Sequence, residues 1–300
     1  MARMKKAHLR RKDGVWDPLA DSGHDKRRAE GVPKTPQTLS PAYRLAYADD
    51  DFLCREELRP VRLQLELMKT EMMLSERGIK STIVMFGGAR IPAPGQDAWA
   101  AKNETQRENL TAASVYYDEA RKFAQLCSQH AESHDYKEYV VVTGGGPGVM
   151  EAGNRGAADV GAPSIALNIV LPHEQAPNEY VTPELSFNFH YFAIRKMHFL
   201  LRAKAVTVFP GGFGTLDELF ETVTLMQTGR MALVPLILFG EKFWRKIIDF
   251  EALAEFGTIS PADVDLLHFV ETAEEAWNVI STFYKKVDAE HVAMVETPRG

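Results

Sequence analysis

Short apolar runs alternate with amphipathic segments from residue 81 onward. Nearly continuous apolar runs predict strands at residues 81–88, 138–148, 163–170, 205–212, 234–240 and 268–271. Apolar positions at helical spacing predict helices at residues 104–132, 149–161, 188–204, 215–229, 241–257 and 272–287. Strands that are apolar along their whole length are typical of a parallel sheet buried on both faces. The pattern therefore predicts an α/β fold, a doubly wound (Rossmann-like) parallel sheet with helices on both faces.

The first part of the chain follows a different pattern. Residues 1–40 are polar, charged and dotted with proline and glycine, which is typical of a flexible or loosely attached arm. Residues 52–77 carry apolar residues at helical spacing, interrupted at Pro60, and Gly78 is a natural helix stop. We therefore expect an N-terminal extension of residues 1–78, an arm followed by one or two helices, and a Rossmann-like domain of residues 79–300.

The composition argues against a nucleic-acid-binding, a membrane-spanning and a secreted protein. The 300 residues are 45% hydrophobic and 25% charged with a net charge of −6, so there is no overall basic field to attract nucleic acid. No segment approaches the roughly 20 apolar residues that span a bilayer, and no secretory or twin-arginine signal follows Arg10 and Arg11. Cys54 and Cys127 have neither metal nor redox spacing. We expect a reduced, cytoplasmic protein, with its cysteines as small core residues and without nucleic-acid or membrane partners.

Three of the predicted strands end in glycines. These are Gly87 and Gly88, then Gly144, Gly145, Gly146 and Gly148, then Gly211, Gly212 and Gly214. Ligands of open parallel sheets bind at the carboxyl ends of strands, where glycine lets backbone N–H groups approach an anion. Neither Rossmann spacing nor a P-loop lysine is present, so the turns suit one phosphate, as in a nucleoside monophosphate. Tight strand-to-helix turns without any ligand are the alternative.

Two acids follow the last of these turns. Thr215 and Glu218 match a capping box, in which the glutamate serves only the helix start, and Asp217 needs no more than a favourable interaction with the helix dipole. The other interpretation is that Glu218 faces a positive charge that develops in the substrate. Cleavage of a nucleotide's N-glycosidic bond creates an oxocarbenium-like ribose, which a nearby carboxylate stabilises.

The segments "PGGFGTLDE" (210–218) and "TGGGPGVMEAGNRGA" (143–157) closely resemble the LOG (Lonely Guy) family. Its members are cytokinin riboside 5′-monophosphate phosphoribohydrolases, many of them long mislabelled lysine decarboxylase. The family pattern P-G-G-x-G-T-x-x-E is matched at every fixed position, and its Arg-Lys pair is found as Arg195 and Lys196. The resemblance covers roughly residues 80–290 and looks like a longer bacterial branch of the family.

The resemblance implies a hydrolase that cleaves the N-glycosidic bond of a purine nucleoside 5′-monophosphate, either AMP or an N6-modified cytokinin nucleotide. It implies that Arg195 and Glu218 are catalytic. It also implies a substrate-binding set of Gly144, Gly145, Gly146, Gly148, Lys196, Gly211, Gly212, Gly214 and Thr215. Neither a metal nor a cofactor is required by this chemistry, and residues 79–300 become the nucleotide-binding catalytic domain. A homodimer or higher homo-oligomer with the site near the interface is implied as well.

Several alternatives stay open at this stage. Arg90 follows the first glycine turn, where it either helps to hold the phosphate or the base of the substrate or lies on the surface. Asn168 and Glu174 follow the third strand near the expected site, where we expect them to bind the ribose or the base of the substrate. Arg195 taken alone also fits an exposed helix residue in a surface ion pair. A non-catalytic nucleotide or molybdenum-cofactor-type carrier on the same fold is the alternative function. A true lysine decarboxylase needs a Schiff-base lysine for pyridoxal phosphate with an acid at the pyridine nitrogen, and no such set is recognisable.

Overall fold

The computed structural model describes residues 10–12, 15–17, 21–171 and 176–296. The chain divides into two compact units, Met1–Leu65 and Glu66–Gly300, and the boundary between them falls inside helix α3 (Arg59–Glu76). The predicted domain boundary after residue 78 stays a prediction. Among the described residues, no helix combines the length and the apolar composition that a membrane crossing requires.

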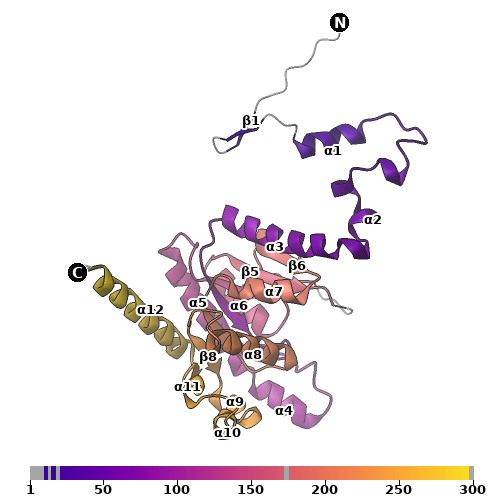
Figure 1. The fold of residues 1–300 in the computed structure, drawn as a ribbon. Coiled ribbons are helices and arrows are strands. Elements are labelled where there is room, and N and C mark those ends of the chain that lie inside the picture. Colours follow the sequence, from indigo (N-terminus) through magenta and orange to yellow (C-terminus); the bar gives the residue numbers. More distant parts are fainter. Residues whose placement is uncertain (1–9, 13–14, 18–20, 172–175, 297–300) are drawn as a thin grey trace. The chain divides into compact units, whose positions relative to one another are not determined.

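The second unit is built on a seven-stranded parallel sheet, drawn in Figure 1. Its strands are β3 (Thr82–Phe86), β4 (Val140–Thr143), β5 (Ser164–Ile169), β6 (Ser186–Phe189), β7 (Ala203–Val208), β8 (Leu236–Phe239) and β9 (Leu267–Val270). The order across the sheet is β6-β5-β4-β3-β7-β8-β9. The strands β4 to β6 therefore lie on one side of β3, and the later strands β7 to β9 lie on its other side. The predicted doubly wound fold is confirmed, and the switch point at β3 and β7 is where such sheets bind ligands.

The strand register brings the ends of the three central strands to one level. Val84 of β3 pairs with Val142 of β4 and with Val206 of β7. Each of these strands ends only one or two residues later, and each continues into one of the glycine turns. The register therefore places the three turns side by side along the same edge of the sheet.

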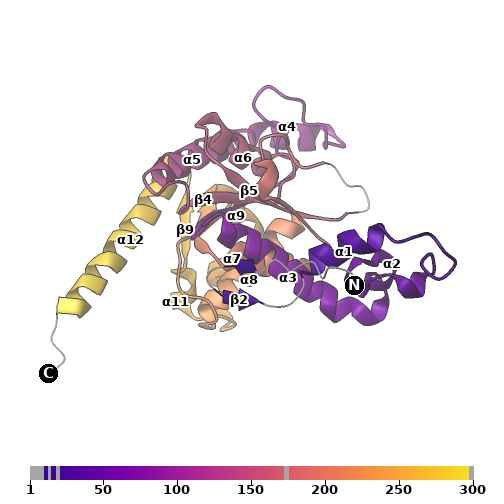
Figure 2. The ribbon, with the colours of Figure 1, turned by 90° about the horizontal axis from the view of Figure 1, so that it is seen from above.

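Helices cover both faces of this sheet, as Figure 2 shows for α5 and α6 on one side and α7 and α8 on the other. The first layer consists of α5 (Val115–Glu132), α6 (Val149–Asp159) and α12 (Ala273–Glu296). The second layer includes α7 (Phe192–Leu200), α8 (Phe213–Gln227) and α9 (Glu241–Ile247). Ile83 packs into the first layer and its neighbour Val84 into the second, because successive strand residues point to opposite faces.

Some elements differ from the sequence-based expectation. The helix expected at 104–132 is two helices, α4 (Glu104–Ala112) and α5. The helix expected at 241–257 also divides, because the Asp249 side chain accepts a hydrogen bond from the backbone N–H of Ala252 and starts α10 (Phe250–Glu255). The edge strand β6 was not predicted, nor were α11 (Pro261–Val264) and the 3₁₀ turn Pro183–Leu185.

The described part of the first unit contains only short elements. They are β1 (Arg10–Lys12), β2 (Val15–Asp17), α1 (Ser22–Glu30), α2 (Asp50–Leu53) and three 3₁₀ turns at Pro41–Tyr43, Ala46–Ala48 and Glu56–Leu58. Helix α1 falls within the segment expected to be a flexible arm, where it is capped by the Asp21 side chain. Cys54 is exposed, so the expectation that both cysteines are core residues is wrong for Cys54 and confirmed for the buried Cys127.

Candidate functional site

The three glycine turns touch one another at the carboxyl edge of the sheet. The backbone N–H of Gly88 donates a hydrogen bond to the carbonyl of Pro210 over 3.0 Å, and the N–H of Val149 donates to the carbonyl of Gly88 over 3.3 Å. The turn after β3 therefore lies between the turn after β4 and the turn after β7. Segments that are more than 50 residues apart in the chain form one continuous stretch of glycine-rich backbone.

The glycines in these turns fall into two groups. A Cβ atom at Gly148 would lie 2.4 Å from the carbonyl oxygen of Gly88, and one at Gly211 would lie 2.1 Å from Oγ1 of Thr215. These two glycines are required because the turns pack closely. A Cβ atom at Gly212 or Gly214 would meet no atom within 4 Å. The backbone at the start of α8 therefore borders open space, where a ligand can approach it.

Helix α8 begins earlier than the sequence pattern indicated. Its N-cap is Gly212, its first residue is Phe213, and no side chain caps it. The alternative interpretation of Thr215 and Glu218 as a capping box is therefore wrong, because Thr215 lies inside the first turn and its N–H donates to the carbonyl of Gly212 over 3.0 Å. The first N–H groups of any α-helix have no partner within the helix and carry a partial positive charge. This end of α8 can therefore bind an anion.

Glu218 lies further along α8 and does not cap the start of the helix. Its side chain is buried, with the residue only 7% exposed, and its carboxylate makes no hydrogen bond to any residue in the described ranges. Burial raises the pKa of Glu218 from its ordinary value of 4.5 to about 7, although the nearby charges of Lys196 and Arg195 act in the opposite direction. A buried carboxyl that titrates near neutral pH is a common feature of catalytic sites.

Arg195 lies on α7 between the end of β5 and the glycine turn after β4. Its Nε–H donates a hydrogen bond to the carbonyl of Leu167 over 2.7 Å, and its guanidinium carbon lies 5.1 Å from the centre of the Phe199 ring. A Cβ atom at Gly144 would lie 2.7 Å from a terminal guanidinium nitrogen of Arg195. Burial lowers the pKa of Arg195, and the charge of Glu218 partly offsets this. Arg195 is half-buried, so the alternative of an exposed surface residue is wrong.

Lys196 forms an ion pair with Asp217, the acid that precedes Glu218 in the motif. Its ammonium nitrogen lies 2.8 Å from Oδ2 of Asp217 and 2.9 Å from Oε2 of Glu221, and the side chain is only 15% exposed. Burial lowers the pKa of Lys196, but the hydrogen bonds to Asp217 and Glu221 outweigh it and keep the ammonium charged. Asp217 thus holds α7 against α8, and the predicted contact of Lys196 with substrate stays a prediction.

A buried network holds the glycine turn after β4, and sequence reasoning missed it. The Thr143 hydroxyl donates to Oδ1 of Asn154 over 2.7 Å and accepts from the N–H of Gly145 over 3.0 Å. The amide nitrogen of Asn178 lies 3.1 Å from the carbonyl oxygens of both Gly145 and Gly146. The network fixes the turn before any ligand arrives. It also uses the N–H of Gly145, which therefore does not face the open side of the turn.

The remaining predicted residues are placed as follows. Asn168 donates from Nδ2 to the carbonyl of Phe187 over 2.9 Å, and its Oδ1 lies close against Gly145. It supports both the edge strand β6 and the glycine turn. Arg90 is exposed just beyond the first glycine turn. Glu174 lies outside the described residues.

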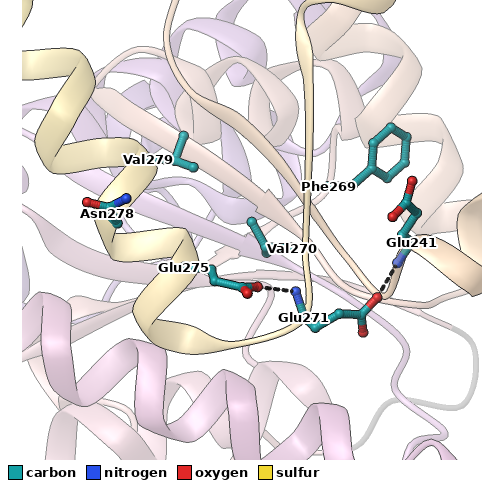
Figure 3. A pocket seen from close by; sticks show the side chains of 7 residues that line it. All are labelled: Glu241, Phe269, Val270, Glu271, Glu275, Asn278 and Val279. Atoms are coloured by element: carbon teal, nitrogen blue, oxygen red, sulfur yellow. Dashed lines mark hydrogen bonds between the residues drawn. The ribbon is translucent and has the colours of Figure 1, made fainter.

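A hollow of about 380 Å³ lies at the ends of β8 and β9, and none of the residues that line it belongs to a glycine turn. Figure 3 shows its lining residues. Two of its acids bind the backbone: Glu271 accepts from the N–H of Glu241 over 2.9 Å, and Glu275 accepts from the N–H of Glu271 over 2.8 Å. The third acid, Glu241, accepts from Nε of Arg245 over 2.6 Å. In the ranges that the structure describes, no group of three histidines, cysteines or acids is arranged to hold a metal ion. The candidate site is therefore the edge formed by the three glycine turns with Arg195 and Glu218.

Comparison with solved structures finds proteins of low sequence identity. A molybdenum cofactor binding protein from the phototrophic bacterium Rippkaea orientalis is 19% identical, covering 68% of this chain and 98% of that one, with a TM-score of 0.43. A molybdenum cofactor carrier protein from Chlamydomonas reinhardtii is 20% identical, covering 69% of this chain and 99% of that one, with a TM-score of 0.42. No curated protein matches the chain.

A family model gives the more informative comparison. It is described as "possible lysine decarboxylase" and matches residues 150–280, which contain Arg195, Lys196 and the whole of α8. This is the label under which LOG proteins were long described, so the match supports the resemblance carried by the glycine motif. Over residues 150–280 the chain is thus similar to the possible lysine decarboxylase family, and both candidate catalytic residues lie within that similarity.

Proposed function

We propose that this protein hydrolyses the N-glycosidic bond of a purine nucleoside 5′-monophosphate, releasing the free base and ribose 5-phosphate. The observation that carries the proposal is Glu218, a buried carboxyl near the charges of Arg195 and Lys196. Such a group destabilises the folded protein and needs a reason to be there. Stabilisation of a cationic ribose supplies that reason.

The spacing along α8 fits such a substrate. Glu218 follows the N-cap Gly212 by six positions, or roughly 9 Å along the helix axis. Because helical side chains lean toward the N-terminus, the carboxyl group reaches back toward the turn. A phosphate bound at the first N–H groups of α8 therefore leaves room for one ribose ring before the carboxyl group is met.

The reaction then needs only water as a second reactant. The bond between C1′ of the ribose and the base nitrogen breaks, and the base keeps the electron pair and gains a proton. Water adds to C1′ and loses a proton, so ribose 5-phosphate is formed. Glu218 in its ionised form stabilises the positive charge at C1′ and orients the water. Arg195 binds oxygens of the phosphate or of the ribose.

The geometry argues against the chemistry that the family label suggests. A lysine that forms a Schiff base must first become a neutral amine. Lys196, the lysine beside Arg195, is instead held as a cation by Asp217 and Glu221. We therefore favour hydrolysis of a nucleotide over decarboxylation of an amino acid.

Incubation with AMP and with isopentenyl-AMP tests the proposed function. Chromatography is expected to show adenine or the modified base appearing together with ribose 5-phosphate. Adenosine is the control, because without its phosphate it cannot use the turn at Gly212 and should be cleaved far more slowly. Thermal stabilisation by AMP without any release of base would contradict hydrolysis and favour a non-catalytic nucleotide or molybdenum-cofactor-type carrier.

We also propose the homodimer that the family resemblance implies. Large apolar side chains are exposed on the two helices that carry Arg195 and Glu218, namely Phe192, Met197, Phe213 and Phe220. Phe213, beside the glycine turn, is 91% exposed. Exposed apolar patches of this kind favour covering by another protein surface. Light scattering is expected to give a mass of at least two chains, and a mass of 33.6 kDa would contradict the dimer.

A further inference from the structure

We propose that Glu66 of helix α3 is a positioning residue that holds the start of α7 and, through it, Arg195. The inference rests on the proposed function for its catalytic consequence, but the contacts that support it do not. Glu66 is the first residue of the second unit and precedes every residue that sequence reasoning assigned to the site.

Glu66 supplies the cap that α7 lacks. Helix α7 begins at Phe192, and its own N-cap residue, Tyr191, offers no side-chain hydrogen bond to the helix. The two carboxylate oxygens of Glu66 accept instead from the N–H of His190 over 2.8 Å and from the N–H of Tyr191 over 3.1 Å. A carboxylate at a helix start satisfies unpaired N–H groups and interacts favourably with the helix dipole. Here that carboxylate comes from 124 positions earlier in the chain.

One further hydrogen bond connects this cap to the candidate catalytic arginine. The backbone N–H of Arg195 donates to the carbonyl of Tyr191 over 3.1 Å, and this is a bond of the first helical turn. Glu66 therefore binds the backbone N–H of Tyr191, and the backbone carbonyl of Tyr191 in turn binds the N–H of Arg195. If the first turn opens, the guanidinium of Arg195 loses its fixed position relative to the carbonyl of Leu167 and the turn at Gly144.

Helix α3 also holds the other end of α7. Glu71 forms an ion pair with Arg202, which lies two positions beyond the end of the helix. Arg202 in turn donates from Nε to the carbonyl of Ile79 over 3.1 Å. With α7 held at its far end in this way, loss of Glu66 is expected to loosen the first turn without releasing the whole helix.

Hydrogen exchange tests directly whether Glu66 holds the start of α7, whatever reaction the protein performs. In a Glu66→Ala variant, the amides of residues 190–196 are expected to exchange about fivefold faster than in the wild-type protein, the size of effect typical for loss of a helix cap. The matched control is Glu76→Ala, which removes an exposed carboxylate from the same helix and should leave these amides unchanged. Unchanged exchange in Glu66→Ala would overturn the proposal.

A double-mutant cycle on base release tests whether Glu66 acts through Arg195. Glu66→Ala is expected to lower kcat about tenfold at 25 °C, where the variant is still folded, because small displacements of an aligned group slow a reaction strongly. In an Arg195→Lys background the same change should have little further effect. An equal loss in both backgrounds would mean a merely structural role. If the wild-type protein releases no base, the proposed function fails. The exchange experiment still shows whether Glu66 holds the start of α7.

Discussion

A Glu218→Gln variant is expected to release free base from AMP about 10³-fold more slowly than the wild-type protein at pH 7, the size of effect typical when one preorganised charge-stabilising group is removed. Glutamine keeps the size of the side chain but carries no negative charge. It therefore cannot stabilise the cationic ribose or accept a proton from the attacking water. The buried environment increases the effect, since little water is present to take over the role of the missing charge.

Single-turnover measurements with the variant in excess over AMP report this loss without interference from product release. The control is Asp217→Asn, which removes the neighbouring carboxylate on the same helix. Asp217 is largely exposed and pairs only with Lys196 in the described structure, so a loss of less than about tenfold is expected. Comparable losses in the two variants would mean that any acid near Lys196 has the same effect, and Glu218 would lose its special role.

The same Glu218→Gln substitution is expected to make the protein more stable above pH 7. In the folded protein the pKa of Glu218 is about 7, raised by burial from the ordinary 4.5 that applies to the unfolded chain. Between these two values the folded state binds the proton more tightly, so this group's contribution to stability falls as the pH rises through that range. Above pH 7 the full penalty of about 3 kcal/mol applies, and glutamine removes it.

Urea unfolding of both proteins at pH 5, 6, 7 and 8 checks this expectation. The free energy of unfolding of the variant should exceed that of the wild-type protein by about 3 kcal/mol at pH 8, and the difference should shrink toward zero near pH 5. For a domain of this size that difference corresponds to roughly 6–12 °C in Tm. A difference that does not change with pH would show that Glu218 does not titrate in this range.

Glu218→Gln is thus expected to lower the rate of base release and to raise the free energy of unfolding. The two results together distinguish a residue that serves the reaction from one that serves the fold. A residue that serves the fold loses stability when it is replaced, and activity falls as a consequence. A residue kept for chemistry at the expense of stability gives the reverse, a more stable and inactive protein. Glu218→Gln is expected to show this second behaviour.

Most of the sheet could be predicted because its strands are marked in the local sequence. Segments such as Val140–Thr143 are almost entirely apolar, and in a short segment that pattern has few explanations other than a strand buried on both faces. The edge strand β6 was missed because only Phe187 and Phe189 of its four residues are buried. Its pairing with β5 decides that it is a strand, and no local pattern reports that pairing.

The candidate site was predictable in its residue types but not in its interactions. The glycines and the Arg195–Glu218 pair form a recognisable motif, because close backbone approach and charge chemistry restrict which residues can serve. The alternative interpretation of Thr215 and Glu218 as a capping box was wrong, because the N-cap of α8 is Gly212 and Thr215 therefore lies inside its first turn. Asn178 gave no signal at all, since its partners at Gly145 and Gly146 lie more than 30 positions away in the sequence.

By itself, the sequence determined the class of fold, and it predicted the edge of the sheet that carries the candidate site and the chemical groups of that site. These depend on periodicity and on backbone freedom, which are local properties of the chain. Only the tertiary structure decided that Lys196 is held by Asp217 and Glu221, and that Glu218 is buried with a pKa of about 7. Proton affinity and charge pairing depend on burial and on distance in space, and both arise only when helices α7 and α8 pack together on the sheet.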